Sequence, residues 1–295
     1  MKPTLRRNYG PFYSAPMMVW FTVFFMAPLL IIVIYSFMRK GLYGGVAMGE
    51  FTLEAYRALG NSSFVIITVR TLITSIVATL ITILIALPCG YFMARSKNQT
   101  LLLLLIIIPF WTNFLIRVFA WMNILGNNGF LNDLLIRIGL IDDYIQFLYN
   151  QGAVVLVLVY MYLPYAILPL FSTIDKFDFS LLEAARDLGA TKAQSMIRVL
   201  LPNIRSGVYT AVLFTFIPIF GAYAVPLLVG GKDSYMLGNV IADQLTKARN
   251  WPLASAISMV LTVVTTIGVI VMMNLQRKDA DRLSGAAKNK RGDGV

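Results

Sequence analysis

Six long apolar segments constrain the fold of this chain more than any other feature. Each is close in length to the roughly 20 residues that a helix needs to cross the hydrocarbon core of a bilayer. Arg70 and Arg117 are the only charged residues within them. We therefore predict an all-α integral membrane protein with six transmembrane helices. Their approximate bounds are 15–38, 64–87, 101–125, 153–174, 207–229 and 253–275.

The distribution of basic residues predicts how these helices are oriented. If the N-terminus is cytoplasmic, the inner segments contain more than twice as many Lys and Arg residues as the outer segments. The positive-inside rule then places both termini in the cytoplasm. This topology accounts for the net charge of +11, so we expect the lipid bilayer as a partner and no nucleic acid.

The chain divides into three parts at the ends of the apolar region. Residues 1–63 comprise the cytoplasmic N-terminus, the first helix and an outer loop. Arg39 and Lys40 follow that helix in place of a small-residue cleavage site, which indicates a retained helix and not a signal peptide. Residues 64–275 form a core of five helices. Residues 276–295 form a polar tail that we expect to be disordered in the cytoplasm.

A cytoplasmic insertion between the fourth and fifth helices, residues 175–206, carries the strongest local signals. Ser180 is followed three residues later by Glu183, and Thr191 is followed in the same way by Gln194. Both pairs are capping-box patterns, in which two side chains satisfy free amide groups at a helix start. The insertion is therefore expected to form two short helices.

Gly189 and Pro202 are expected to end these two helices. Glycine adopts the left-handed conformation that is common after a helix, and proline lacks the amide hydrogen that would continue one. On the second helix, helical spacing predicts an apolar face made of Ala193, Met196, Ile197 and Leu200.

The insertion resembles the EAA loop of ABC-importer permeases, whose motif is Glu-Ala-Ala, three residues, Gly, nine residues and Ile-x-Leu-Pro. The matching residues, with Val199 in place of Ile, are Glu183, Ala184, Ala185, Gly189, Val199, Leu201 and Pro202. The resemblance implies that the first short helix docks in a groove on a cytoplasmic ATPase and transmits its closure to the transmembrane helices. The residues alone also fit a helical hairpin in which Glu183 only caps its own helix.

Four segments resemble the B-type permeases of spermidine/putrescine importers, and the likeness extends from about residue 29 to the sixth helix. They are PFWTNFLIR (109–117), LEAARDLGA (182–190), GNVI (238–241) and WPLASA (251–256). The resemblance implies a type I ABC-importer permease fold in the inner membrane of a bacterium, translocating polyamines. It also implies a heterodimer with a C-type permease, two ATPase subunits and an extracytoplasmic polyamine-binding protein.

One position departs from the polyamine permeases. They usually carry an acidic residue between Pro226 and the Gly230-Gly231 pair, where it could receive a cationic amine. This chain has Leu227 there, within a Leu-Leu-Val run. The departure leaves a related organic cation or another small solute open as the substrate of the same machinery.

Aromatic residues are the candidates for a solute path, because no Asp or Glu lies within the six segments. A polycation would then depend on cation–π contacts, worth about 0.5–2 kcal/mol each, and on acids from a partner subunit. The candidates are Tyr160, Tyr162, Tyr165, Phe214, Phe216, Phe220 and Tyr223, with Asp233 and Asp243 at the outer mouth. Packing against other helices or lipid is the alternative role for these rings.

Helix-breaking residues are expected to interrupt the fourth and fifth helices, either to expose carbonyls to a cavity or merely to kink the helices. They are Pro164 and Pro169 in the fourth helix, and Pro218, Gly221 and Pro226 in the fifth. Arg117 is expected to orient helices or to pair with a neighbour. Arg70 is expected to extend to the outer lipid headgroups.

Missing residue types argue against other protein classes. The chain has no His and a single Cys, Cys89, which excludes His-based acid–base chemistry, Cys/His metal sites and an intrachain disulfide. It has no Gly-x-x-x-x-Gly-Lys-Ser/Thr loop, so we expect no enzyme and no cofactor, with ATP and Mg bound by the partner ATPase. A stand-alone secondary transporter is a further alternative, but its proton or sodium coupling usually needs an intramembrane acid.

Overall fold

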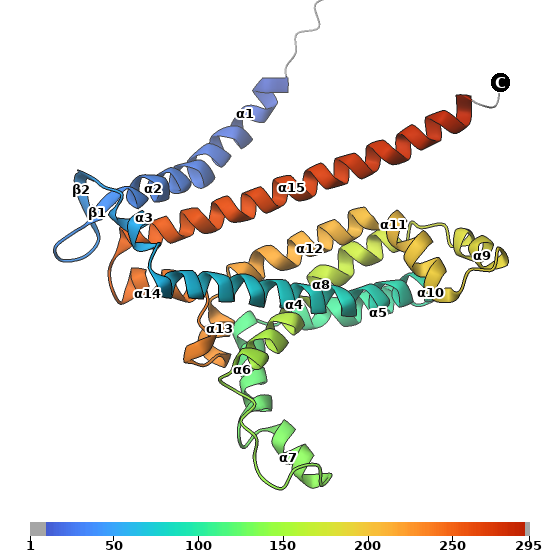
Figure 1. The fold of residues 1–295 in the computed structure, drawn as a ribbon, viewed down its shortest axis with the longest axis horizontal. Coiled ribbons are helices and arrows are strands. Elements are labelled where there is room, and N and C mark those ends of the chain that lie inside the picture. The colour runs from blue at the N-terminus through green and yellow to red at the C-terminus, as the bar shows by residue number, and fades with distance from the viewer. Residues whose placement is uncertain (1–9, 293–295) are drawn as a thin grey trace, which may run out of the picture. The chain divides into compact units, whose positions relative to one another are not determined.

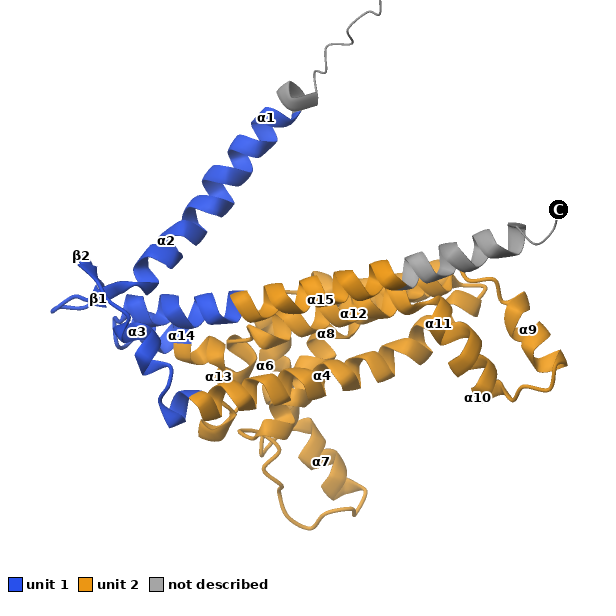
Figure 2. Ribbon diagram, turned by 45° about the horizontal axis from the view of Figure 1, so that its top comes forward, with its two compact units in different colours: residues 1–64, 241–262 blue, residues 65–240, 263–295 orange. Residues whose placement is uncertain are grey.

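The computed structural model describes residues 10–292 and is built mainly of α-helices. It divides into two compact units, residues 1–64 with 241–262 and residues 65–240 with 263–295 (Figure 2). Among the described residues, four helices are long and apolar enough to cross a membrane: Ser14–Ser36, Ser62–Arg95, Gln151–Ile174 and Trp251–Lys278. Two bent helix pairs bring the number of spans to six if each pair is one span. The predicted all-α membrane fold is confirmed.

The first unit begins with the first span and a short hairpin. Helices α1 (Gly10–Phe21) and α2 (Ala27–Ser36) are joined by a π-helical turn, and the antiparallel strands β1 (Met38–Lys40) and β2 (Val46–Phe51) and helix α3 (Glu54–Ala58) follow. Gly44 and Gly45 have positive φ angles of 93° and 75° in the loop between the strands. The Gly45 amide donates a hydrogen bond of 2.8 Å to the Arg249 carbonyl, which fixes this loop.

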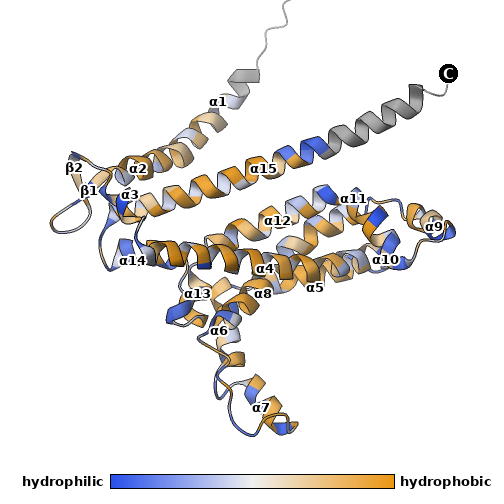
Figure 3. Cartoon of the chain, in the orientation of Figure 1, coloured by the Kyte–Doolittle hydropathy of each residue, from blue (hydrophilic) through white to orange (hydrophobic). Residues whose placement is uncertain are grey.

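The other helices follow in chain order, and α4, α8 and α12 run side by side (Figure 1). They are α4 (Ser62–Arg95), α5 (Gln99–Ile107), α6 (Phe114–Leu125), α7 (Phe130–Arg137), α8 (Gln151–Ile174), α9 (Ser180–Asp187), α10 (Lys192–Ser195), α11 (Leu201–Asn203), α12 (Arg205–Phe220), α13 (Ala224–Val229), α14 (Leu237–Thr246) and α15 (Trp251–Gly292). Hydrophobic residues cover most of α4 and α8, whereas hydrophilic residues gather around α10 and α11 (Figure 3). This distribution suits a membrane-embedded bundle with a polar end.

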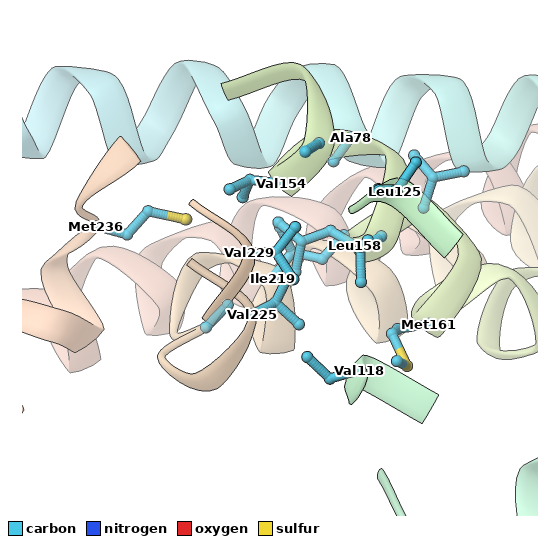
Figure 4. Packing of buried hydrophobic residues seen from close by; sticks show 14 of the residues in the cluster. Ala78, Val118, Leu125, Val154, Leu158, Met161, Ile219, Val225, Val229 and Met236 are labelled. Carbon is cyan, nitrogen blue, oxygen red and sulfur yellow. The ribbon is translucent and has the colours of Figure 1, made fainter. Parts of the chain in front are cut away.

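Two clusters of buried apolar side chains hold the second unit together. One joins α6, α8, α12 and α13, and includes Val118, Leu158, Ile219 and Val229 (Figure 4). The other joins the C-terminal ends of α4 and α8 to the insertion, through Met93, Ile174, Leu182, Leu200 and Ile204. Gly207 of α12 lies against the Thr173 side chain and the Pro169 carbonyl of α8. Small residues at such positions let transmembrane helices approach closely.

The third predicted helix is not one straight span, which corrects the expectation for residues 101–125. Helices Gln99–Trp111 and Phe114–Arg137 meet at an angle of 92°. Thr112 between them is extended, with a ψ angle of 145°. Asn113 then caps α6, because its side-chain oxygen accepts a hydrogen bond of 2.8 Å from the Leu115 amide. A proline in the preceding turn and an Asn cap are ordinary signals for ending one helix and starting another.

The polar tail is helical where the structure describes it, so the prediction of disorder is wrong for residues 276–292. Helix α15 continues without a break from Trp251 to Gly292. The residues after Gln276 are rich in Ala, Lys and Arg, which are good helix formers. They extend a helix that is already nucleated by the transmembrane part, and extension costs far less than nucleation. Residues 1–9 and 293–295 of the predicted termini lie outside the described residues.

Candidate functional site

The insertion folds into two short helical segments, as predicted. Helix α9 ends at Asp187, and Gly189 follows with a φ angle of 88°, in the left-handed region that glycine tolerates. The second segment runs through α10, a π-helical turn at Met196–Leu200 and α11. It ends at Asn203, one residue after Pro202, where the chain bends by 75° into α12.

Only one of the two predicted capping boxes forms. The Thr191 amide donates to the Gln194 side chain at 2.9 Å, and the Gln194 amide donates to the Thr191 hydroxyl at 3.2 Å. At α9 the prediction is wrong, because the carboxylate of Asp178 accepts the Ser180 amide at 3.0 Å in place of a Ser180–Glu183 box. Hydrogen bonds from the Ser180 side chain and backbone hold the pKa of the Asp178 carboxyl below its usual range. Glu183 is therefore not used as a cap.

The buried face of the second segment differs from the predicted one. Leu200 is buried and Met196 is half-buried, as expected, but Ala193 and Ile197 are exposed, Ile197 by 63%. Ser195 and Val199 take their places on the inner face. Val199 and Leu200 pack into the apolar cluster at the ends of α4 and α8, and this tertiary packing, which helical spacing does not contain, selects the inner face.

The motif residues of the insertion take up different positions. Glu183 and Ala184 are exposed on α9, Ala185 is half-buried, and Gly189 lies in the exposed turn. On the second segment Val199 and Pro202 are half-buried and Leu201 is exposed. These seven residues therefore do not form one continuous cluster of exposed side chains.

Exposed apolar side chains accompany Glu183 on this part of the surface. Leu181 and Leu188 are exposed on and just after α9, Leu188 by 89%, and Ile197 is exposed on the second segment. Leu182 is instead 2% exposed and anchors α9 to the helix ends. Exposed apolar side chains beside an exposed carboxylate have the character of a protein-docking surface.

The candidate tyrosines of α8 belong to an aromatic cluster with neighbouring segments. Tyr160 meets Trp121 edge-on at 5.3 Å between ring centroids, and Tyr165 meets Phe110 edge-on at 5.2 Å. Tyr162 contacts Tyr165 at 5.8 Å. Tyr160 and Tyr165 keep exposed faces and Tyr162 is half-buried, so part of each ring is open to a solute or a partner helix.

The aromatic candidates after α8 differ in access. Phe214 and Tyr223 are exposed and Phe216 is half-buried. Phe220 is only 2% exposed and stacks on Phe216 at 5.5 Å, so its ring packs within the protein in this conformation. Phe220 is thus the weakest of the four candidates.

The two outer acids have different surroundings. Asp233 is exposed and lines a groove of about 610 Å³ together with Arg70, Thr74 and Gln151 and with apolar residues of α4. Asp243 is paired with Lys247 at 2.8 Å. Asp233 is therefore the better candidate for an acid that attracts a cationic solute, because Asp243 already pairs with a lysine.

Arg117 packs on an aromatic ring and makes no ion pair among residues 10–292. Its guanidinium carbon lies 4.6 Å from the centroid of the Phe110 ring, across the bend between the two halves of the third span. Its Nε is buried and has no hydrogen-bond partner among the described residues. The expectation that Arg117 orients helices agrees with this contact.

The prolines have unequal effects. Pro164 and Pro169 lie inside the continuous helix α8, so the predicted interruption of the fourth helix is wrong. Transmembrane helices tolerate proline where neighbouring helices support them, and α8 packs along α12. In the fifth helix the prediction is confirmed, because α12 ends at Phe220 and α13 starts at Ala224.

Two residues outside the insertion, Tyr91 and Arg95, contact it and were not predicted from the sequence. Phe179 of the segment before α9 contacts Arg95 and Tyr91 at the end of α4. The motif suggests nothing about such contacts, because it covers the insertion alone. No group of three or more His, Cys, Asp or Glu side chains in the described part of the chain could hold a metal ion.

Comparison with known sequences finds one matching protein family and several similar permeases. Residues 82–279 match the family described as binding-protein-dependent transport system inner membrane component. The spermidine/putrescine transport system permease protein PotB of Escherichia coli K12 is 36% identical over 260 residues, covering 88% of this chain and 94% of that protein. PotB of Haemophilus influenzae is 38% identical over 254 residues, covering 85% and 88%.

Solved structures show the same fold at low sequence identity. A chain of a bacterial alginate ABC transporter, in complex with its alginate-bound periplasmic protein, has a TM-score of 0.73 and 16% identity, covering 90% of this chain and 93% of that one. A chain of the inward-facing MetNI methionine ABC transporter has a TM-score of 0.54 and 20% identity, covering 73% and 95%.

Proposed function

Since the chain belongs to the binding-protein-dependent transport system inner membrane components, the permease subunits of ABC importers, we propose that it moves a polyamine, spermidine or putrescine, across the membrane. The protein is a multi-pass inner-membrane permease and not an enzyme, and a separate ATPase subunit hydrolyses ATP. An extracytoplasmic binding protein delivers the solute to such permeases.

The polyamine assignment rests mainly on one observation. The PotB permeases, named for spermidine and putrescine, are 36–38% identical to this chain over 85–88% of its length. Identity of this extent, without large gaps in coverage, favours a shared solute class. Exposed faces on Tyr160, Tyr165, Phe214 and Tyr223 supply the cation–π surfaces that a polycation can use in passing.

Leu227 favours a second candidate, another organic cation. It lies in α13 within the Leu-Leu-Val run that stands where polyamine permeases usually carry an acid. A leucine there gives no charge to neutralise a protonated amine. A solute with fewer positive charges would need less compensation than spermidine.

The insertion is the contact with the ATPase in this proposal. Glu183 and Ala184 are the exposed motif residues on α9, with Leu181 and Leu188 beside them. The remaining motif residues, Ala185, Gly189, Val199, Leu201 and Pro202, shape and anchor the two segments. The complete assembly contains this chain, a C-type permease, two ATPase subunits that bind ATP and Mg, and a polyamine-binding protein.

Both termini are cytoplasmic in this assembly. The excess of Lys and Arg on the insertion and the terminal segments supports that orientation. It is also the one that places the insertion on the side of the ATPase. Residues 127–150, which include α7, then lie on the outer side together with Asp233.

Ligand binding by the cognate extracytoplasmic binding protein tests the substrate. We expect the purified binding protein to bind spermidine or putrescine in calorimetric titration, with an anion and a neutral sugar as controls. Tight binding of a monovalent organic cation, with none of either polyamine, would instead favour the second candidate. Binding of the sugar or the anion alone would contradict both.

A further inference from the structure

Four side chains, Tyr91, Arg95, Phe177 and Phe179, form a clamp that joins the segment before α9 to the C-terminal end of α4. The Arg95 guanidinium lies over the Phe179 ring, 5.4 Å from its centroid, and donates a hydrogen bond of 3.2 Å to the Tyr91 hydroxyl. The Tyr91 ring meets Phe179 edge-on at 6.0 Å. Phe177 meets Phe179 in the same way at 5.6 Å. The Phe179 ring is thus held by two residues of α4.

Helix α9 cannot shift independently of this clamp. Phe179 directly precedes Ser180, the first residue of α9, and Leu182 is buried in the cluster that contains Met93 of α4. Next to the clamp, the Gln99 side chain donates to the Asp175 carboxylate at 2.9 Å and to the Ala94 carbonyl at 3.0 Å. The ends of α4, α5 and α8 therefore meet where α9 is attached.

Helix α4 extends from the clamp to the other end of the bundle. It runs for 34 residues without interruption, which corresponds to about 51 Å at 1.5 Å per residue. Towards its other end the Thr71 hydroxyl accepts a hydrogen bond of 3.0 Å from the Leu237 amide. Thr74 and Gln151 of α8 are hydrogen-bonded as well. A displacement at Arg95 would thus reach residues near the start of α8 and of α14.

We propose that Tyr91 and Arg95 are positioning residues that pass the movement of α9 into α4 when the ATPase closes. The chain itself connects α9 only to α8 and α12, which flank the insertion, so α4 receives the movement through side-chain contacts. The inference rests on the proposed function in one respect, namely that α9 contacts the ATPase. It names a route into the bundle that the motif of the insertion does not include.

Uptake by the complete transporter in lipid vesicles tests the clamp. Arg95→Ala and Phe179→Leu are each expected to lower ATP-driven spermidine uptake by about fivefold or more, the lower limit of typical coupling between sites. The ATPase should still co-purify in wild-type amounts. Arg95→Lys keeps a cation over the ring and should restore most of the uptake. Lys97→Ala removes an exposed cation two residues away and serves as the matched control, expected to be unchanged.

A label on α4 gives a readout that does not depend on the solute. In a Cys89→Ser background, a fluorophore on Val69→Cys reports on the far part of α4, where Val69 is exposed. We expect ATP binding to change its fluorescence in the wild type, and Arg95→Ala to abolish the change while the ATPase stays bound. Wild-type vesicles that give this signal but take up no spermidine would contradict the proposed substrate and leave the clamp supported.

Three results would contradict the proposal that the clamp passes the movement of α9 into α4. The first is uptake within about twofold of wild type in both Arg95→Ala and Phe179→Leu, less than any typical coupling between sites. The second is loss of the ATPase from the purified complex, which would mean that the clamp only shapes the docking surface. The third is an unchanged fluorescence response of the α4 label in Arg95→Ala.

Discussion

Glu183→Lys is expected to lower ATP-driven solute uptake by about 100-fold or more, because reversing one charge of a desolvated interface pair costs several kcal/mol. The carboxylate is exposed on α9 and makes no hydrogen bond or ion pair among the described residues. It is also not needed as a cap, since Asp178 fills that role. The substitution is therefore expected to remove the proposed contact with the ATPase without breaking a hydrogen bond of the described residues.

Three measurements on the same membranes check this expectation. Membrane insertion of Glu183→Lys should match wild type, whereas ATPase co-purification and spermidine uptake should both be lost. Asp187→Lys is the matched control, because Asp187 is the last residue of the same helix and a cation suits a helix C-terminus. Normal uptake by Glu183→Lys, or an equal loss in Asp187→Lys, would contradict a specific docking role for Glu183.

Leu182→Asp is expected to prevent assembly of the transporter altogether. Leu182 is 2% exposed and lies in a cluster of buried apolar side chains with Ile174, Leu200 and Ile204, so a carboxylate placed there would lose its hydration. Losing the buried side chain and burying a polar group in its place should cost about 4 kcal/mol or more. The insertion would then detach from the helix ends, and α9 would no longer be presented to the ATPase.

Limited proteolysis distinguishes this effect from that of Glu183→Lys, because co-purification of the ATPase is expected to be lost in both variants. In Leu182→Asp the insertion should become sensitive to protease and the ATPase should be absent from the purified complex. Leu182→Met preserves apolar volume and should cost less than about 1.5 kcal/mol, so it should assemble normally. A protected insertion in Leu182→Asp would show that the cluster does not hold α9.

The sequence identifies which residues form the spans, but it does not show where a span bends. Hydropathy depends on the number of consecutive apolar residues, so the third span was recognised while the turn at Thr112 was not. The signals for that turn, Pro109 and Asn113, are present in the sequence. Proline alone is ambiguous, because Pro164 lies within an unbroken helix. Packing against neighbouring helices decides whether a proline ends a helix or lies within an unbroken one. A local sequence pattern contains no information about that packing.

The candidate site shows the same division between local and tertiary signals. The Thr191–Gln194 box and the turn at Gly189 are local, and both were predicted. The inner face of the second segment depends on its packing against the ends of α4 and α8, so the prediction placed Ile197 on the wrong face. The contact of Arg95 with Phe179 joins distant parts of the chain, and no motif in either part indicates it.

Solute uptake by the complete transporter tests the central claim most directly. Vesicles that contain this chain, its partner permease and two ATPase subunits are loaded with ATP and Mg and supplied with the binding protein and radiolabelled spermidine or putrescine outside. We predict uptake that requires both ATP and the binding protein and that Glu183→Lys abolishes. Accumulation that continues without ATP or without the binding protein, or failure to take up either polyamine while another solute is taken up, would contradict the account.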